Sequence, residues 1–302
     1  MTAPVETRRL TKRYGDLTAV DALDLEVRAG EVYGFLGPNG AGKTTTLRML
    51  LGLIRPTSGS VRLFGRAPGE RGHLSRVGSL VEGPAFYPYL SGRDNLRVLA
   101  RHAGAGRDRI PLVLDQVDLT GRAGDRYGTY SLGMKQRLGV AGALLKDPRL
   151  VVLDEPTNGL DPAGMADMRR LVRRLGAAGC TVLLSSHLMT EVQELCDRVG
   201  IIAGGRLVAE STVAGLRGES RLRVVATPLD AAATFARDLL GAEAVRVSDG
   251  GLDLAVPPGE VAAVNARLVG AGIAVSELTI RERSLEQAFF DLTTTIEEPD
   301  HA

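Results

Sequence analysis

The chain has 302 residues, 44% of them apolar, and a formal net charge of +1. This length predicts two globular domains, and a charge so close to zero argues against the broad basic face of a nucleic-acid-binding protein. The sequence begins without the apolar run of a signal peptide and contains no stretch of roughly 18 apolar residues, so we expect no membrane span in this chain.

The first fifty residues predict two strands and a helix in close succession. Residues 23–28 alternate apolar and charged side chains, which indicates a strand with one buried face. Residues 32–36 are a short apolar run that indicates a buried strand, and residues 44–53 repeat apolar side chains at helical spacing, with Ile54 continuing that face. A glycine-rich loop joins this strand to this helix.

That loop, Gly-Pro-Asn-Gly-Ala-Gly-Lys-Thr over residues 37–44, matches G-x-x-x-x-G-K-[ST] at every fixed position. Its backbone N–H groups and the helix N-terminus are expected to hold the β-phosphate of a nucleotide. Lys43 is expected to contact the β- and γ-phosphates, and the Thr44 hydroxyl to ligate Mg²⁺. The alternative interpretation is a glycine-rich surface turn, which would not need a buried strand before it and a helix after it. Because both are expected here, we predict that the chain binds and hydrolyses Mg·ATP. The predicted nucleotide-binding residues here are Gly37, Pro38, Asn39, Gly40, Ala41, Gly42, Lys43, Thr44 and Thr45.

Strands and helices alternate in the following part of the chain. The predicted elements beyond residue 55 are helices at 94–102, 112–117 and 163–175 and strands at 150–153 and 181–184. Such alternation is typical of a parallel α/β sheet.

Two acids, Asp154 and Glu155, directly follow the apolar strand at 150–153. In open α/β sheets, ligands lie beyond the carboxyl ends of the strands. Asp154 is suited to hold Mg²⁺, and Glu155 is suited to orient and deprotonate the attacking water. A strand that simply ends in acids is common, but beside a phosphate-binding loop this pair predicts a catalytic site.

A second domain is predicted after a linker at residues 216–220. The elements expected beyond it are strands at 222–226, 244–247, 252–256 and 274–279 and helices at 230–240, 259–270 and 284–292. A βαββαβ order is that of a small split-βαβ sandwich. We therefore predict domains at residues 1–216 and 220–296.

Three further motifs lie near these acids. Residues 130–137 read Tyr-Ser-Leu-Gly-Met-Lys-Gln-Arg, residues 158–161 read Asn-Gly-Leu-Asp, and a lone His187 follows the strand at 181–184. Together with the phosphate loop, they make residues 4–215 resemble the ATP-binding subunit of an ATP-binding cassette (ABC) transporter. The resemblance implies a RecA-like P-loop core with an antiparallel β subdomain and a helical subdomain.

The resemblance also implies roles for single residues. Tyr14 matches the aromatic residue that stacks on adenine, although an ordinary tyrosine at a strand end would look the same. Ser131 and Gly133 match the signature loop that binds the γ-phosphate held by the opposite subunit, and residues 159–161 match a loop that crosses the dimer interface. His187 matches a histidine that contacts the γ-phosphate.

Two features depart from the family pattern. The signature reads Tyr-Ser-Leu-Gly-Met over residues 130–134 where Leu-Ser-Gly-Gly-Gln is usual, and Met134 cannot form the hydrogen bonds of an amide. Glu82 stands where a glutamine that ligates Mg²⁺ is usual; a carboxylate can still bind the metal but changes the local charge. The segment around Glu82 and the signature are similar to subunits of bacitracin, lantibiotic and daunorubicin-type drug exporters, as is the C-terminal stretch that begins at Ser284.

By this resemblance we expect a homodimer that closes over two ATP molecules, a separate membrane permease and a location at the cytoplasmic face of the cell membrane. Residues 83–95, which hold Phe86, Tyr87 and Tyr89, are the segment we expect to help dock the permease. A local hydrophobic plug is the alternative interpretation of these aromatics. Three other classes stay open, namely an importer subunit, a soluble ABC ATPase outside transport and a catalytically dead binding module.

Overall fold

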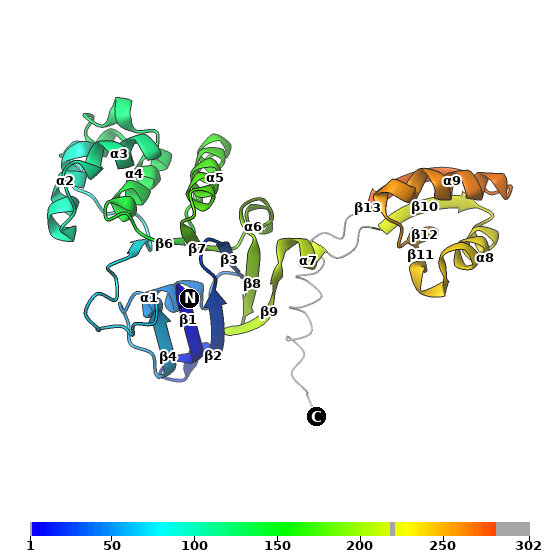
Figure 1. Cartoon of the computed structure of the whole chain (residues 1–302), viewed down its shortest axis with the longest axis horizontal. Helices are drawn as coiled ribbons and strands as arrows, with labels where there is room; N and C mark the ends of the chain where they lie inside the picture. Colours follow the sequence, from blue (N-terminus) through cyan, green and yellow to red (C-terminus); the bar gives the residue numbers. More distant parts are fainter. Residues whose placement is uncertain (1, 218–220, 282–302) are drawn as a thin grey trace. The chain divides into compact units, whose positions relative to one another are not determined.

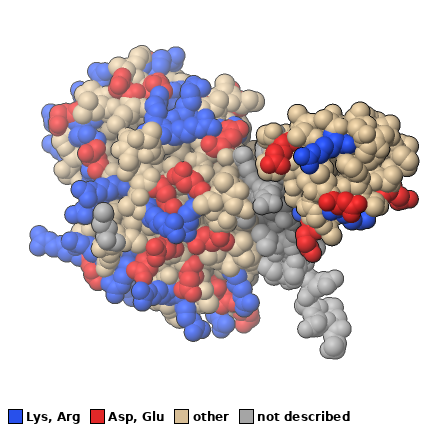
Figure 2. Space-filling model, turned by 45° about the vertical axis from the view of Figure 1, so that its right-hand side comes forward, with Lys and Arg blue, Asp and Glu red and all other residues tan. Residues whose placement is uncertain are grey.

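The computed structural model describes residues 2–217 and 221–281, which fall into two compact units, Met1–Val213 and the part of the chain from Ala214 onwards. Figure 1 shows the elements of both units, and Figure 2 shows acidic and basic side chains interspersed over one face of the first unit. Residues 216 and 217, which we predicted as the start of a linker, belong instead to the short helix α7 (Val213–Arg217). Residues 218–220 lie outside the described chain.

A six-stranded sheet forms the centre of the first unit, in the order β5-β6-β7-β3-β8-β9. Neighbouring strands are parallel except for β9, which pairs antiparallel with β8. The prediction of a parallel α/β sheet is therefore confirmed. The strands are β3 (Val32–Leu36), β5 (Val77–Leu80), β6 (Leu150–Asp154), β7 (Thr181–Ser186), β8 (Arg198–Ala203) and β9 (Arg206–Thr212).

A second, antiparallel sheet has the order β2-β1-β4 and shares one hydrophobic core with the first. Its strands are β1 (Val5–Tyr14), β2 (Leu17–Val27) and β4 (Ser58–Leu63). Leu23, Leu25 and Val27 of β2 are buried while Asp24 and Glu26 between them are exposed, as the alternation predicts.

Helix α1 (Lys43–Leu50) packs between the two sheets through Leu47 and Leu50. We predicted that this helix would continue to residue 53, but Gly52 adopts a left-handed conformation (φ 72°) and ends it. Ile54 therefore lies in the turn beyond the helix, where it is partly buried against the same core.

Helices α2, α3 and α4 form the predicted helical subdomain (Figure 1). Short 3₁₀ turns at Thr120–Arg122 and Tyr127–Thr129 connect α3 to α4. No helix of the described chain is long and apolar enough to span a bilayer. The helices of this unit are α2 (Gly92–Ala103), α3 (Arg109–Gln116), α4 (Leu132–Leu144), α5 (Pro162–Ala177) and α6 (Met189–Leu195).

The second unit has the predicted βαββαβ order over its described residues. Its antiparallel sheet has the order β11-β12-β10-β13, and its core holds Leu222, Val224 and Leu252 together with Ala232 and Leu268 of the two helices. The helix predicted at 284–292 lies outside the described residues. The elements are β10 (Arg221–Thr227), α8 (Leu229–Leu240), β11 (Val245–Ser248), β12 (Gly251–Leu254), α9 (Val261–Gly270) and β13 (Ala274–Arg281), with 3₁₀ turns at Ala242–Ala244 and Pro258–Glu260.

Candidate active site

The phosphate loop connects the end of β3 to the start of α1. Its two outer glycines are required by close approaches, because a Cβ on Gly37 would lie 2.4 Å from the Ile202 carbonyl and one on Gly42 would lie 2.4 Å from the Ala19 carbonyl. Gly42 also has a φ of 104°, which side chains rarely tolerate. The loop is thus fixed against β2 and β8 with Pro38, Asn39 and Gly40 exposed, Ala41 buried and Thr45 partly buried.

Lys43 is the buried cation of this loop, with 5% of the residue exposed. Its ammonium donates hydrogen bonds to the carbonyls of Gly37 (2.7 Å) and Pro38 (3.1 Å). It also lies 3.2 Å from one oxygen of Glu155. The charge of Lys43 is therefore held at the centre of the loop, opposite the acids of β6.

Asp154, at the end of β6, joins the two sides of the site. One of its oxygens accepts a hydrogen bond from the Thr44 hydroxyl (2.8 Å) and the other accepts one from Ser185 (2.5 Å). A hydroxyl and a carboxylate oxygen in contact are the hard oxygen donors that Mg²⁺ prefers, so these residues fit a magnesium ion.

Glu155 occupies a left-handed backbone conformation (φ 45°) that is costly for a residue with a side chain. Its N–H donates to the hydroxyl (2.9 Å) and the carbonyl (3.2 Å) of Ser185. Its second oxygen accepts a hydrogen bond from Nδ1 of His187 at 2.7 Å. The carboxylate therefore lies between a lysine and a histidine, and Nε2 of His187 is left free of this contact.

Ser185 is a site residue that sequence reasoning missed. It is fully buried at the end of β7, donates to Asp154 and accepts from the Glu155 backbone, so it fixes both acids. Its position two residues before His187 was the signal that could have indicated it.

The turn that carries His187 is held by a second buried network. The Ser186 hydroxyl accepts a hydrogen bond from the N–H of Leu188 (2.9 Å) and donates one to Glu191 of α6 (2.8 Å). Glu191 is 1% exposed, and its other oxygen has no hydrogen-bond partner among the described residues. The two residues on either side of His187 are thus tied to each other and to α6.

The signature residues lie apart from this cluster, at the start of α4. Ser131 caps the helix by accepting from the N–H of Met134 (3.3 Å) and is exposed, and a Cβ on Gly133 would meet no atom closer than 3.9 Å. The preceding Tyr130 is buried, its hydroxyl donates to the Arg122 carbonyl (2.7 Å), and burial raises the pKa of this tyrosine. The buried tyrosine thus anchors the loop, while Ser131 is exposed and Gly133 is partly exposed.

Glu82 is exposed and has a φ of 67°; its carboxylate is paired with the guanidinium of Arg48 in the last turn of α1. The structure thus gives it a cationic partner and does not place it among the hydrogen bonds of Thr44 and Asp154. Its expected magnesium role remains a prediction.

Tyr14 is half exposed at the end of β1, with the Lys12 ammonium 4.9 Å from its ring centre. It pairs with Leu17 across the β1–β2 turn, and β2 then runs past the phosphate loop at Ala19. The ring is thus exposed on the strand pair that borders the loop, and its contact with a base stays a prediction.

The two cysteines take no part in the site and form no disulfide. Burial raises the pKa of the Cys196 thiol and raises that of Cys180 to about 11. Both stay protonated at neutral pH and are poor nucleophiles.

Comparison with known proteins identifies the family. The ABC transporter family pattern matches residues 20–158. The bacitracin transport ATP-binding protein BcrA of Bacillus licheniformis is 42% identical over 299 residues, which cover 97% of this chain and 98% of that protein. The chain belongs to the ABC transporter family. Its activity is ATP hydrolysis coupled to transport, as the sequence predicts.

Another relative of this ABC transporter chain and a solved structure each match 70% of it. The lantibiotic transport ATP-binding protein SrtF of Streptococcus pyogenes is 38% identical over 211 residues, 70% of this chain and 92% of that protein. A solved ATP-binding subunit of an ABC transporter superimposes with a TM-score of 0.63 at 29% identity, over 70% of this chain and 91% of its own. The expected P-loop fold is thereby confirmed.

Proposed function

We propose that this chain is the ATPase subunit of an exporter, and that Lys43, Glu155 and His187 are its catalytic residues. The observation that supports this most directly is the continuous contact from the Lys43 ammonium through the Glu155 carboxylate to the His187 imidazole. Glu155 can accept the proton of an attacking water, and Lys43 and His187 can stabilise charge on the γ-phosphate. In this mechanism the phosphates of ATP replace Glu155 as the partner of Lys43, and the carboxylate can then accept the proton of the water.

We propose Thr44, Asp154 and Glu82 as the magnesium ligands of this chain. Magnesium bound there would neutralise charge on the phosphates. Thr44 and Asp154 are already in contact, and Ser185 holds the aspartate in position.

Replacing Glu82 with glutamine tests its share in this site. Glu82 and Arg48 form an exposed ion pair, so their separation should change the free energy of unfolding by less than about 1 kcal/mol. The Glu82→Gln variant should bind ATP as the parent does but should need more Mg²⁺ for half-maximal ATPase activity. Arg48→Gln, which removes the same ion pair, is the control and should keep the parent's Mg²⁺ dependence. If both variants showed the same dependence of ATPase activity on Mg²⁺ concentration, a magnesium role for Glu82 would be contradicted.

We propose a homodimer as the working unit. Ser131 is exposed and Gly133 is partly exposed at the N-terminus of α4. The N-terminus of a helix favours anions, and no hydrogen bond of the described chain joins either residue to the phosphate loop. The γ-phosphate contacts of the signature are therefore available to a second copy. Closure over two ATP molecules would add these contacts, and hydrolysis would remove them.

The permease partner is proposed to bind an apolar groove between the central sheet and the helical subdomain. The groove has a volume of about 380 Å³ and is lined mainly by apolar side chains, with Leu53 64% exposed at its edge. Phe86 lines it and also packs edge-on against Tyr127 at 5.3 Å, whereas Tyr87 and Tyr89 are exposed. The predicted aromatic segment thus combines a local packing role at Phe86 with two exposed rings, those of Tyr87 and Tyr89, whose centres lie 5.8 Å apart.

Export is favoured because the relatives named for bacitracin and lantibiotic transport match this chain. A chain of this kind would act at the cytoplasmic face of the membrane, through its permease. The transported molecule need not contact this chain, so its substrate class is proposed only as a peptide antibiotic or a similar drug.

A charged substitution in the groove tests permease docking. Leu53→Asp should lower co-purification with a co-expressed permease at least about tenfold, because a carboxylate would be buried against apolar surface. Basal ATPase activity of the isolated chain should change less than about twofold. Leu112→Asp on α3, a similarly exposed leucine outside the groove, is the control and should co-purify normally. Undiminished recovery of the Leu53→Asp variant would place the permease elsewhere.

A further inference from the structure

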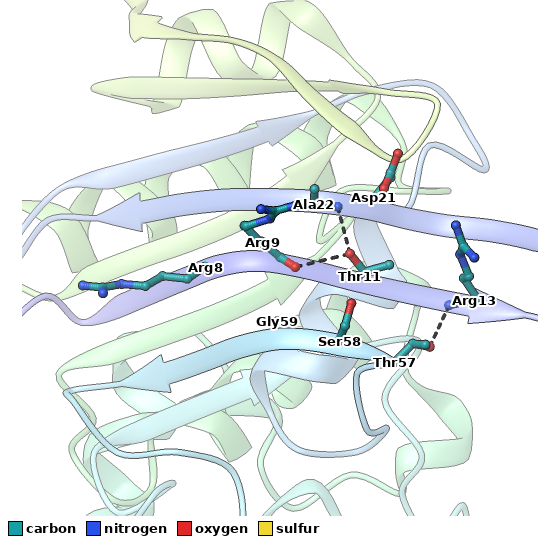
Figure 3. A pocket seen from close by; sticks show the side chains of 9 residues that line it. All are labelled: Arg8, Arg9, Thr11, Arg13, Asp21, Ala22, Thr57, Ser58 and Gly59. Atoms are coloured by element: carbon teal, nitrogen blue, oxygen red, sulfur yellow. Dashed lines mark hydrogen bonds between the residues drawn. The ribbon is translucent and has the colours of Figure 1, made fainter.

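A hollow of about 640 Å³ lies on the solvent side of the antiparallel sheet, and the phosphate loop does not contribute to it (Figure 3). Strands β1 and β2 and the start of β4 provide its walls. The lining residues are Arg8, Arg9, Thr11, Arg13, Asp21, Ala22, Thr57, Ser58 and Gly59.

An irregularity in β1 shapes this hollow. The pairing of β1 shifts register between Thr7 and Leu10 against β2, and again between Arg8 and Thr11 against β4. Arg9 adopts a φ of 45°, and its carbonyl lies so close to Gly59 that a Cβ there would be 2.2 Å away. Bulges of this kind redirect side chains, and here two consecutive arginines, Arg8 and Arg9, are both exposed.

The hollow carries unpaired positive charge. Arg8 pairs with Glu6 (2.7 Å), and Asp21 pairs with Arg206 (2.6 Å) outside the hollow. The guanidinium groups of Arg9 and Arg13 have no hydrogen bond or ion pair with any side chain or carbonyl of the described chain. With one acid against three arginines, the lining has a net charge of +2.

Hydroxyl donors lie between these cations. The Thr11 hydroxyl donates to the Arg9 carbonyl, while the Thr57 hydroxyl accepts from the N–H of Arg13 and keeps its own hydrogen free. The Ser58 hydroxyl has no partner within the described residues. Figure 3 shows Thr11 and Ser58 in the middle of the hollow, with Arg8 and Arg9 toward one end and Arg13 at the other.

The spacing suits a ligand with two separated anionic groups. Arg9 and Arg13 lie toward opposite ends of the hollow (Figure 3), so each guanidinium can hold an anionic group of its own. Arginine binds phosphate oxygens through paired N–H donors. Two phosphates held at the ends, with hydroxyl contacts between them, would use all the free donors.

We propose that this hollow is a binding site for a ligand that carries at least two phosphate groups. Two kinds of ligand present phosphate groups in this way. One is a soluble linear polyphosphate, and the other is a pair of neighbouring headgroups of an anionic phospholipid. The site is separate from the nucleotide residues, so the proposal does not depend on the assignment of the catalytic groups.

Binding of defined probes to the full chain tests this site. Saturating Mg·ADP is present to fill the phosphate loop, and the probes are short-chain linear polyphosphate and vesicles of phosphatidylglycerol or phosphatidylcholine. The parent should bind polyphosphate, phosphatidylglycerol vesicles or both, more weakly as salt rises. Binding to polyphosphate alone identifies the soluble source, and binding to phosphatidylglycerol vesicles identifies the lipid source.

A double substitution separates this site from general surface charge. Arg9→Asn with Arg13→Gln should lower the affinity at least about tenfold; asparagine tolerates the left-handed conformation at position 9. Arg28→Gln with Arg62→Gln removes two exposed charges outside the hollow and should stay within about twofold of the parent. The proposal is overturned if the two double variants lose affinity for the phosphate probes to the same extent. It is also overturned if polyglutamate binds to the parent as tightly as polyphosphate does, or if neither phosphate probe binds to the parent at low salt.

Discussion

Replacing Glu155 with glutamine should lower the rate of ATP hydrolysis by about 10²–10⁴-fold, the usual contribution of a general base. Glutamine keeps the size of the side chain and can still contact Lys43 and His187, but it cannot accept the proton of the attacking water. ATP binding should therefore persist while hydrolysis becomes slow. The measurement is phosphate release by the purified chain at saturating Mg·ATP.

The same variant should accumulate as a dimer, because ATP that is not hydrolysed keeps the proposed signature contacts in place. Light scattering after gel filtration with ATP should show twice the monomer mass, and removal of ATP should restore the monomer. Glu194→Gln, an exposed glutamate on α6 that pairs with Arg169, is the matched control and should hydrolyse ATP like the parent. A Glu155→Gln chain that stays monomeric at saturating ATP would contradict the proposed dimer.

Lys43→Ala should reduce ATP hydrolysis by about 10²–10³-fold, the loss seen when one preorganised donor to a developing charge is removed. The ammonium is buried and positioned by the carbonyls of Gly37 and Pro38, and no other side chain of residues 37–44 carries a positive charge. Nucleotide affinity should fall as well, because Lys43 is expected to contact both outer phosphates. Steady-state turnover and nucleotide titration measure the two effects.

Because Lys43 also pairs with Glu155, its replacement could lower turnover by destabilising the fold. This effect must be distinguished from the loss of the contact with the phosphates. Lys43→Met keeps most of the aliphatic chain, and both variants should unfold within a few degrees of the parent in thermal denaturation. Lys146→Ala removes an exposed lysine that, within the described residues, donates only to the Leu74 carbonyl, and it should leave turnover of the isolated chain unchanged. If a folded Lys43 variant hydrolysed ATP at the parent's rate, the lysine would not be a catalytic residue.

Local sequence was sufficient to predict those parts of the site whose backbone conformation follows from adjacent residues. The phosphate loop at residues 37–44 lies between β3 and α1 as predicted, because its glycines, the buried strand before it and the helix after it are consecutive in the chain. The acids at the end of β6 were predictable for the same reason. The end of α1 was misplaced by three residues because apolar periodicity continues through Gly52, whose conformation stops the helix.

The partners of these residues required the tertiary structure. Ser185 contacts both acids because β7 lies beside β6 in the sheet, although 31 positions separate it from Asp154 in the sequence. Glu82 has Arg48 as its partner, which no motif indicated. The sequence by itself determined which chemical groups this protein carries and the local turns that present them. Only the folded sheet decided which groups meet, because strand order joins side chains that the sequence keeps far apart.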